Sequence, residues 1–430
     1  MSRQKEQRSP AVDENPRKIA LMLLTNAYDP DPRVRQEALA LIRMGCRVRL
    51  LAWDRDLRCP QFESMEGIEV ERVFLSSRHG RGNTQLLFYA WLYLKMLLRG
   101  WHTPFDIIHC HDLDTLPLGF LLGKLKGKPI VYDAHESFLD MLTGNVHPIV
   151  KSGLRWLEDF LIQRVDLLIT VGEKLRRLFA ARGARRSVVV GNWKRLEEFS
   201  RREEQNLKIR RGLGIPDFAI VVVCITQLLK DRKIEVLLEA LDACPDVYLI
   251  IGGRGILEGL VRERAAKNPR IRFVGFVSAA DIANYTCAGD VVYYGFDPEN
   301  PNAQFSAPNK LFEALAAGRP LITGDFGEIA EVVRNASCGL VLPEYSVEAI
   351  SYALTALSDS RQRSTMARNA RRFGEGAMNW RMGEEILYTE YSVLLPNGLS
   401  ASAPCESASP SFAGGATANV ETSLDMELRR

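Results

Sequence analysis

The sequence lacks a long apolar run, a paired-cysteine motif and a strong net charge, and each of these absences excludes a class of protein. No run reaches the length of a membrane-spanning segment. The eight cysteines are scattered, with no C-x-x-C motif and no histidine spacing that suits a metal. The 56 Lys and Arg are nearly balanced by 53 Asp and Glu, which argues against a nucleic-acid-binding protein. The N-terminal stretch MSRQKEQRSPAVDENPRK has no apolar core of a secretory signal, so we expect a cytoplasmic chain with reduced thiols.

Short apolar runs rich in β-branched residues alternate with helical segments along most of the chain. Runs such as KIALMLLT, FDIIHCH and KPIVYD have the composition of parallel strands that are buried on both faces of a sheet. A second series, with FAIVVVCITQ and VYLIIGG, follows a polar stretch that has no apolar period. The pattern therefore predicts an α/β protein with two doubly wound, Rossmann-like domains. Such domains bind ligands at the carboxyl ends of their strands, which predicts a site in a cleft between the two.

The segment SAPNKLFEALAAGRPLI, residues 306–322, predicts a short helix that leads into a buried strand. Gly318 suits the left-handed position just past the helix end, and Asn309 and Glu313 share one face because they are four residues apart. The N-terminus of such a helix favours an anion such as a diphosphate, and Glu313 could accept hydrogen bonds from the hydroxyls of an attached ribose. Alternatively, Glu313 only pairs with Lys310 on a solvated face.

This segment closely resembles the C-terminal signature of retaining nucleotide-sugar glycosyltransferases of family 4, which have the GT-B fold. Further stretches follow in the order and spacing of that family, so the resemblance extends over roughly residues 18–395. They are DPRVRQEALALIRMGCRVRLLA, FDIIHCHDLDTLPLG, KPIVYDAHESF, VDLLITVGEKL, VVVGNW, ITQLLKDRKIEVLLEAL, LIIGGRG, IRFVGFVSAADIANY and NWRMGEEILYTEYSVLL. The resemblance implies transfer of a hexose from a nucleotide sugar, a UDP- or GDP-sugar, to an acceptor hydroxyl with retention of the anomeric configuration. It implies no metal and no cofactor beyond this co-substrate.

The resemblance and the composition together divide the chain into domains and connecting segments. They are a disordered N-terminal tail (1–16), a Rossmann-like acceptor-side domain (17–200), a linker (201–216), a Rossmann-like nucleotide-sugar-binding domain (217–378), a closing helix that returns to the first domain (379–396) and a disordered tail (397–430). The implied process is polysaccharide biosynthesis, with a saccharide or a lipid-linked saccharide as the acceptor.

For the donor, the resemblance assigns Glu313 to the ribose and Arg232 to the diphosphate. A fixed guanidinium and a helix N-terminus can stabilise a departing diphosphate in place of a metal. Lys230 beside Arg232 could assist, although a solvated basic turn is the simpler interpretation of this lysine. The other expected donor contacts are Gln227, Lys233, Gly253, Val277, Phe305, Ser306, Ala307, Asn309, Lys310 and Leu311.

The chain departs from the family pattern at two places. Thr226 and Gln227 stand where the family often has a Gly-Arg pair, so one phosphate-binding cation is missing. Many members also carry a glutamate eight residues before the second one, and here that position is Phe305. Backbone amides of residues 304–307 could hold the hexose hydroxyls instead.

In the first domain, His135 of YDAHES matches a family histidine beside the donor sugar. An imidazole there can bind a hydroxyl or stabilise charge near the anomeric carbon, so His135 joins Arg232 and Glu313 in the expected catalytic set. A structural histidine is the alternative. The expected acceptor-side residues are Arg33, His111, Asp112, Asp133 and Glu136, with Asp112 the first choice for contact with sugar hydroxyls. Arg33 could meet an anionic acceptor or simply cap the local Asp29 and Asp31.

Two segments have second interpretations. Asp112–Asp114 fits the D-x-D pattern of metal-dependent transferases with the other major fold, but it lies inside the better-fitting HCHDLDTLP, so we expect no metal. The segment QLLFYAWLYLKMLLRGW is expected to be a core-facing helix. It could instead touch an anionic membrane at the inner face, helped by the Lys- and Arg-rich residues 174–211.

Two rival functions stay open at this point. Sugar-nucleotide epimerases share the two-domain fold and would need acid and base groups, for which Asp133 and Glu136 are available. A nucleotide-sugar-binding protein without turnover is the second rival, and it is supported by Phe305 and Gln227.

Overall fold

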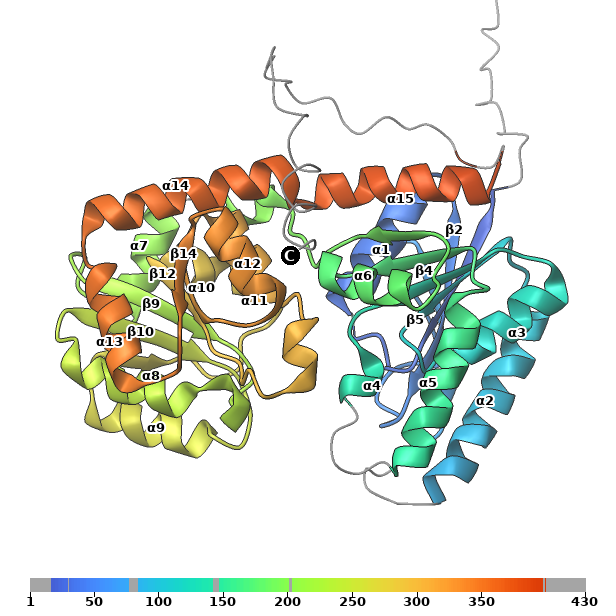
Figure 1. Cartoon of the computed structure of the whole chain (residues 1–430), viewed down its shortest axis with the longest axis horizontal. Coiled ribbons are helices and arrows are strands. Elements are labelled where there is room, and N and C mark those ends of the chain that lie inside the picture. Colours follow the sequence, from blue (N-terminus) through green and yellow to red (C-terminus); the bar gives the residue numbers. More distant parts are fainter. Residues whose placement is uncertain are drawn as a thin grey trace, which may run out of the picture. The chain divides into compact units, whose positions relative to one another are not determined.

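The structure is a computed structural model that describes residues 17–29, 31–76, 84–141, 147–200, 203–396 and 399. In this part of the chain the strands form two sheets, of eight and six strands (Figure 1). Their orders are β3-β4-β2-β1-β5-β6-β7-β8 and β11-β10-β9-β12-β13-β14. The two sheets with helices on their faces confirm the predicted fold class. The tails predicted at 1–16 and 397–430 lie outside the described residues, apart from Leu399.

The first domain holds the eight-stranded sheet of the described residues. Its strands are β1 (Ile19–Leu24), β2 (Arg47–Asp54), β3 (Phe62–Met65), β4 (Ile68–Phe74), β5 (Ile107–His111), β6 (Ile130–Ala134), β7 (Leu167–Thr170) and β8 (Ser187–Val189). Its helices are α1 (Pro32–Arg43), α2 (Thr84–His102), α3 (Leu116–Lys126), α4 (Phe138–Met141), α5 (Pro148–Ile162), α6 (Glu173–Ala181) and the 3-10 turn η1 (Leu196–Phe199). The antiparallel edge strand β3, which pairs with β4, was not predicted.

The second domain holds the six-stranded sheet. Its strands are β9 (Ile220–Ile225), β10 (Val247–Gly252), β11 (Ile271–Phe273), β12 (Val291–Tyr294), β13 (Leu321–Gly324) and β14 (Gly339–Leu342). Its helices and 3-10 turns are α7 (Glu203–Gly212), η2 (Lys230–Arg232), α8 (Ile234–Ala240), η3 (Leu241–Ala243), α9 (Glu258–Lys267), α10 (Ile282–Ala288), η4 (Pro301–Gln304), α11 (Asn309–Ala317), α12 (Gly327–Asn335), α13 (Val347–Ala356) and α14 (Ser360–Ala377), followed by α15 (Trp380–Leu394).

The apolar runs form strands because both of their faces are covered. Successive side chains of a strand point to opposite faces, and in β1 Leu21 and Leu23 join one core cluster while Ala20 and Met22 join the other. The first cluster includes residues of α2, α3, α5 and α6, and the second includes residues of α1 and α15. Each face of the first sheet is therefore closed by helices, as the near-continuous apolar composition of its strands requires.

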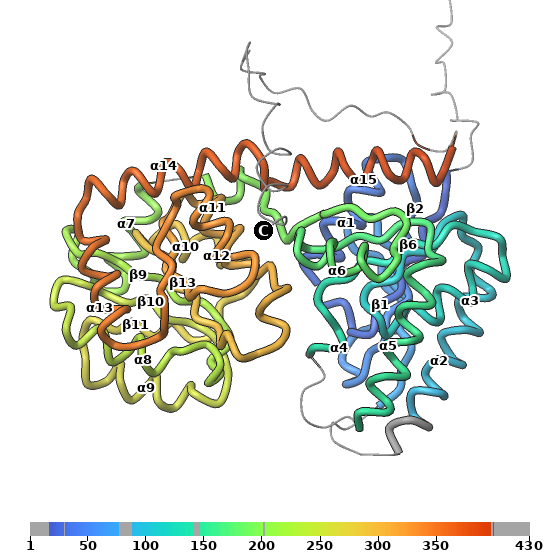
Figure 2. The backbone as a smooth tube through the Cα atoms, in the orientation of Figure 1, coloured from blue at the N-terminus to red at the C-terminus, as the bar shows by residue number. Residues whose placement is uncertain are grey.

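Two connecting segments are helical, and only the first of them was not expected to be. The polar stretch that we expected to be a linker is helical over α7, where Arg210 pairs with Asp290 at 2.8 Å and is almost fully buried. The final helix α15 packs on the first domain, because Leu387 and Tyr391 share a core cluster with residues of α1. In Figure 2 the chain runs from α14 directly into α15, which lies over α1.

Candidate active site

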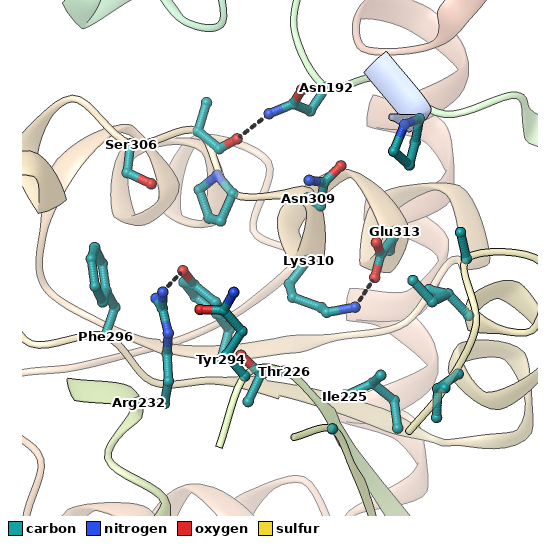
Figure 3. A pocket seen from close by; sticks show the side chains of 18 of the residues that line it. Asn192, Ile225, Thr226, Arg232, Tyr294, Phe296, Ser306, Asn309, Lys310 and Glu313 are labelled. Atoms are coloured by element: carbon teal, nitrogen blue, oxygen red, sulfur yellow. Dashed lines mark hydrogen bonds and ion pairs between the residues drawn. The ribbon is translucent and has the colours of Figure 1, made fainter. Parts of the chain in front are cut away.

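A cavity of about 1260 Å³ opens at the carboxyl ends of β9 and β12, the point where the strand order of the second sheet reverses. Residues of both domains line it, and Figure 3 shows part of the lining. All three residues of the expected catalytic set, His135, Arg232 and Glu313, are among them. The expected donor contacts that line this cavity are Gln227, Gly253, Val277, Ser306, Ala307, Asn309 and Lys310.

Helix α11 places a carboxylate on the wall of this cavity. Glu313 is only 2% exposed, and it pairs with Lys310, one turn earlier on the same helix (Figure 3). The predicted pairing therefore exists, but on a buried wall of the cavity and not on a solvated face. Gly318 takes the predicted left-handed conformation at the helix end, with φ of 59°. A carboxylate held in this way can accept hydrogen bonds from ligand hydroxyls without a large change in its surroundings.

The turn η2 brings a guanidinium to the same cavity. Arg232 Nη1 donates a hydrogen bond to the hydroxyl of Tyr294 at 2.9 Å, and the guanidinium lies 4.3 Å from the ring centre of Phe296 (Figure 3). Its Nε is buried and has no hydrogen-bond partner among the described residues, although it lies 3.8 Å from Asp231 Oδ1. The two aromatic rings thus fix the orientation of Arg232, while part of its donor capacity stays available to an anion.

Three expected donor residues do not line the cavity. Lys233 has φ of 51°, and its ammonium pairs with Asp297 at 3.0 Å. Phe305 packs against the main apolar cluster, and Leu311 is part of that cluster. The backbone N–H of Leu311, expected to face an anion, donates to the carbonyl of Pro308 at 3.1 Å. Helix α11 turns Leu311 toward the core, and the left-handed turn after η2 brings Lys233 to Asp297.

The loop after β10 approaches the cavity through a glycine. Gly253 has φ of 144°, and a Cβ atom on it would lie 1.8 Å from the carbonyl oxygen of Thr226. Only glycine fits there, because the end of β9 lies directly against the loop. Arg254 and Phe276, beside it, also line the cavity, with the guanidinium 4.3 Å from the ring centre. The segment GGRG is thus a close-packed turn at the site.

Several residues that line the cavity were not predicted from the sequence. Lys194 donates to Asn309 Oδ1 at 2.5 Å, and Asn192 donates to the carbonyl of Ala307 at 3.0 Å. Asn192 ends the VVVGN run and Lys194 follows it by two residues, and both lie more than a hundred residues before their partners. Tyr294 and Phe296, at the end of β12, orient Arg232. The position of all four near the end of a strand could have indicated that they line the site, whereas their residue types alone could not.

His135 lies between two carboxylates at the edge of the cavity. Its Nε2 is 2.8 Å from Asp133 Oδ2 and its Nδ1 is 3.3 Å from Asp112 Oδ2. Burial alone would lower the pKa of His135, but Asp112 and Asp133 outweigh it and raise the pKa to about 9. His135 is therefore an imidazolium at neutral pH with both ring nitrogens engaged. His135 can therefore stabilise a bound sugar through its positive charge more than through a new hydrogen bond from its ring.

Asp112 owes this position to an unusual backbone conformation. Its φ is 63°, in the left-handed region, so the chain turns sharply after β5. Its Oδ1 accepts a hydrogen bond from the backbone N–H of His135 at 3.1 Å. Asp112 does not line the cavity, and neither does Asp114, whose carboxylate accepts from Thr25. The two aspartates of the D-x-D pattern therefore bind different partners within the protein.

Arg33, His111 and Asp133, expected on the acceptor side, lie outside the cavity lining in a buried polar network. Arg33 donates from Nη2 to Asp133 Oδ1 at 2.6 Å and from Nε to Oδ2 at 3.0 Å, and it reaches Glu37 at 3.1 Å. It does not cap Asp31, which instead caps helix α1. Burial alone would raise the pKa of Asp133, but Arg33 and His135 hold it well below its ordinary value.

The same network contains atoms that could hold a metal. Ligand atoms of Glu37, His109, His111 and Asp133 lie within 4.8 Å of one another. The Nε2 atoms of both histidines have no hydrogen-bond partner among the described residues. However, the guanidinium of Arg33 already lies against both carboxylates, so the protein itself supplies a positive charge there. That the reaction needs no metal stays a prediction.

Of the expected acceptor-side residues, Glu136 is the one that lines the cavity. Its Oε2 accepts a hydrogen bond from Asn302 Nδ2, on η4 of the second domain, at 2.8 Å. Burial raises the pKa of Glu136 above its ordinary value. The pair places a carboxylate and an amide on the wall of the cavity that Arg232 and Glu313 also line.

Comparisons with known proteins agree with this geometry. Residues 30–193 match the family model described as a glycosyl transferase 4-like domain, and residues 219–360 match that of glycosyl transferases group 1. An uncharacterized glycosyltransferase of Methanocaldococcus jannaschii is 24% identical over 348 residues, 78% of this chain and 86% of that protein. Phosphatidyl-myo-inositol mannosyltransferase of Mycobacterium leprae is 27% identical over 266 residues, 59% of this chain and 64% of that protein.

Solved structures show the same fold. Sucrose-phosphate synthase from Thermosynechococcus elongatus superposes with a TM-score of 0.71 at 18% identity, covering 88% of this chain and 99% of that one. The Anabaena protein HepE in complex with UDP-glucose gives a TM-score of 0.65 at 16% identity, covering 87% and 99%. The two family models match the two domains in order, and the chain belongs to the family 4 nucleotide-sugar glycosyltransferases of the GT-B fold.

Proposed function

We propose that this glycosyltransferase moves a hexose from a nucleotide-sugar donor, a UDP- or GDP-sugar, to an acceptor hydroxyl with retention of the anomeric configuration. The observation that carries the proposal is that Glu313 and Arg232 line one cavity, at the carboxyl ends of the strands of the second domain. A buried carboxylate suits the ribose, and a guanidinium with available donors suits the diphosphate. The start of α11, beside them, adds the positive end of a helix dipole.

In this proposal the diphosphate leaves toward Arg232 and α11 while the acceptor attacks from the same face of the sugar. The acceptor oxygen forms the new bond to the anomeric carbon, the bond to the diphosphate breaks, and the acceptor proton passes to the departing phosphate oxygen. Arg232 stabilises the charge that develops on the leaving group. Glu136 and Asn302, hydrogen-bonded to each other on the cavity wall at 2.8 Å, would contact sugar hydroxyls in place of the glutamate that Phe305 replaces.

The alternative function, epimerisation of a nucleotide sugar, would need two acid/base groups, and only one of the two candidates lines the cavity. Asp133 is fully buried, paired with Arg33 and absent from the cavity lining, so it is poorly placed to exchange a proton with a sugar. Glu136 alone remains for that role. The acceptor hydroxyl in this proposal belongs to a glycan, a lipid-linked saccharide or a small metabolite.

Product analysis by NMR tests the proposal. The protein would be incubated with a donor that binds and with saccharide acceptors, and the coupling constant of the new anomeric proton would be compared with that of the donor. We expect the same anomeric configuration in donor and product. An inverted product contradicts retention, and an epimerised nucleotide sugar formed without acceptor supports the first rival. Binding of a donor that is never consumed supports a protein without turnover.

A further inference from the structure

The outer side of α2 carries a stripe of large apolar side chains. Trp91, Leu94, Leu98 and Trp101 are exposed and recur at helical spacing, so they lie on one side of the helix. Leu92 and Met96, by contrast, are buried in the core, as expected for a core-facing helix. Helix α2 is therefore apolar on both sides, which packing within the first domain alone does not explain.

The stripe continues over two neighbouring helices. Helix α3 packs against both α2 and α5, and the three helices contribute to the same core cluster, so they cover the same face of the sheet (Figures 1 and 2). The ring centres of Phe120 on α3 and Phe160 on α5 are 6.2 Å apart, and Phe160 stacks on Trp156 at 5.9 Å. We call the exposed side chains Trp91, Leu98, Trp101, Leu125, Trp156 and Phe160 the tryptophan face.

The distribution of tryptophan singles out this face. Of the six tryptophans in the sequence, Trp53, Trp193 and Trp380 are buried. The other three are 52%, 47% and 68% exposed, and all three belong to the tryptophan face. Tryptophan concentrates where one part of a surface is apolar and another is wet, as at the headgroup level of a lipid bilayer.

The charged residues of α2 and α3, two of the helices that carry the tryptophan face, are all basic. The sequences of α2 and α3 contain no Asp or Glu, and they carry Lys95, Lys124 and Lys126. Each of these ammonium groups lies over an aromatic ring, at 5.4 to 5.8 Å for Trp91, Phe120 and Trp101. Helix α5 does contain Glu158 and Asp159, but both pair with Arg182. The basic residues 174–211, by contrast, are largely paired, as Arg210 is with Asp290.

From these observations we propose that the tryptophan face docks on a lipid bilayer with anionic headgroups. The apolar side chains would enter the interface while the three lysines meet the headgroups. Among the described residues, none of the helices has the length and hydrophobicity of a membrane-spanning segment. The contact that we propose is peripheral. A second copy of the chain is the less suitable occupant, because it would bring the like-charged lysines of both faces together. The inference does not depend on the proposed sugar transfer.

Vesicle binding of the full chain tests this inference. We expect binding to vesicles of phosphatidylcholine with phosphatidylglycerol, much weaker binding to phosphatidylcholine alone, and a loss at high salt. The variant with Trp91→Ala, Trp101→Ala and Trp156→Ala should bind the anionic vesicles at least tenfold more weakly. Phe218→Ala with Tyr352→Ala, two exposed aromatic residues of the second domain, is the matched control and should bind like the wild type.

Quenching of tryptophan fluorescence by brominated lipids adds a readout that does not depend on variants, because the buried tryptophans serve as an internal reference. Quenching of about half of the emission supports insertion of the exposed three. Absence of binding to anionic vesicles overturns the proposal, as does equal binding by the triple variant. Concentration-dependent dimerisation that the triple variant abolishes, without vesicle binding, also overturns it and assigns the face to a second copy.

Discussion

Replacing Arg232 by Met is expected to lower kcat by about a hundredfold to a thousandfold, the usual effect of removing one fixed donor from a developing anion. Arg232 meets the cavity with a buried Nε that has no hydrogen-bond partner among the described residues, while Tyr294 and Phe296 hold the guanidinium in place. A donor diphosphate would accept hydrogen bonds from the remaining N–H groups of this guanidinium. Steady-state kinetics with the preferred donor measures the effect, and unchanged thermal unfolding would show that the fold is intact.

The neighbouring Lys230 provides the control for this experiment. It lies on the same turn η2, but it is exposed and does not line the cavity. Lys230→Met should change kcat by less than about threefold, since an exposed cation at a distance is screened by solvent. Arg232→Lys should keep part of the rate, because it retains the charge but not the fork of donors. A loss below tenfold in Arg232→Met would contradict the role assigned to this residue.

Replacing Arg33 by Met is expected to lower the free energy of unfolding of the first domain by about 3–5 kcal/mol, the usual cost of removing one partner of a buried ion pair. Asp133 and Glu37 are fully buried, and Arg33 contacts both. Burial and the neighbouring Asp133 raise the pKa of Glu37 to about 8, so Glu37 is largely protonated already, whereas Asp133 without Arg33 would have to pick up a proton or remain as an uncompensated charge. Urea unfolding followed by circular dichroism measures the change.

The pH dependence of stability provides a second readout for Arg33. Because the pKa of Asp133 is depressed in the folded protein, its contribution to stability is present above about pH 4 and is lost as the pH falls through the folded-state pKa. In Arg33→Met this contribution should shrink, so the wild type and the variant should become more alike in acid. Arg35→Met is the control: Arg35 pairs with Glu66 at the surface, and its loss should cost less than about 1 kcal/mol. Equal effects of the two substitutions would contradict the account of the network.

The sequence predicted well the features that depend on local pattern. The parallel strands of both sheets, the left-handed Gly318 and the grouping of Arg232 and Glu313 at one cavity follow from apolar periodicity and from the family signature. Helix α7 was missed because its polar sequence has no apolar period, and its packing rests on Arg210, a residue type that is usually exposed.

The acceptor-side residues were predicted less well, because contacts between residues far apart in the sequence determine where their side chains lie. Arg33 and Asp133 are 100 residues apart, and only the fold shows that they neutralise each other instead of facing an acceptor. Lys194 and Asn309 are 115 residues apart, so their hydrogen bond at the cavity was equally invisible. The sequence alone predicts that a charged residue lies on the surface or in a site, and only knowledge of its buried partner corrects this prediction.

Donor binding by Glu313 variants tests the central claim most directly. Calorimetry across UDP-, GDP-, ADP- and TDP-sugars would compare the wild type with Glu313→Gln and with Glu348→Gln, an exposed glutamate of α13. We predict that at least one donor binds, that Glu313→Gln weakens it about tenfold to a hundredfold through loss of charged hydrogen bonds to the ribose, and that Glu348→Gln leaves it unchanged. Failure of every donor to bind, or equal affinity in Glu313→Gln, would contradict the assignment of this cavity as the donor site.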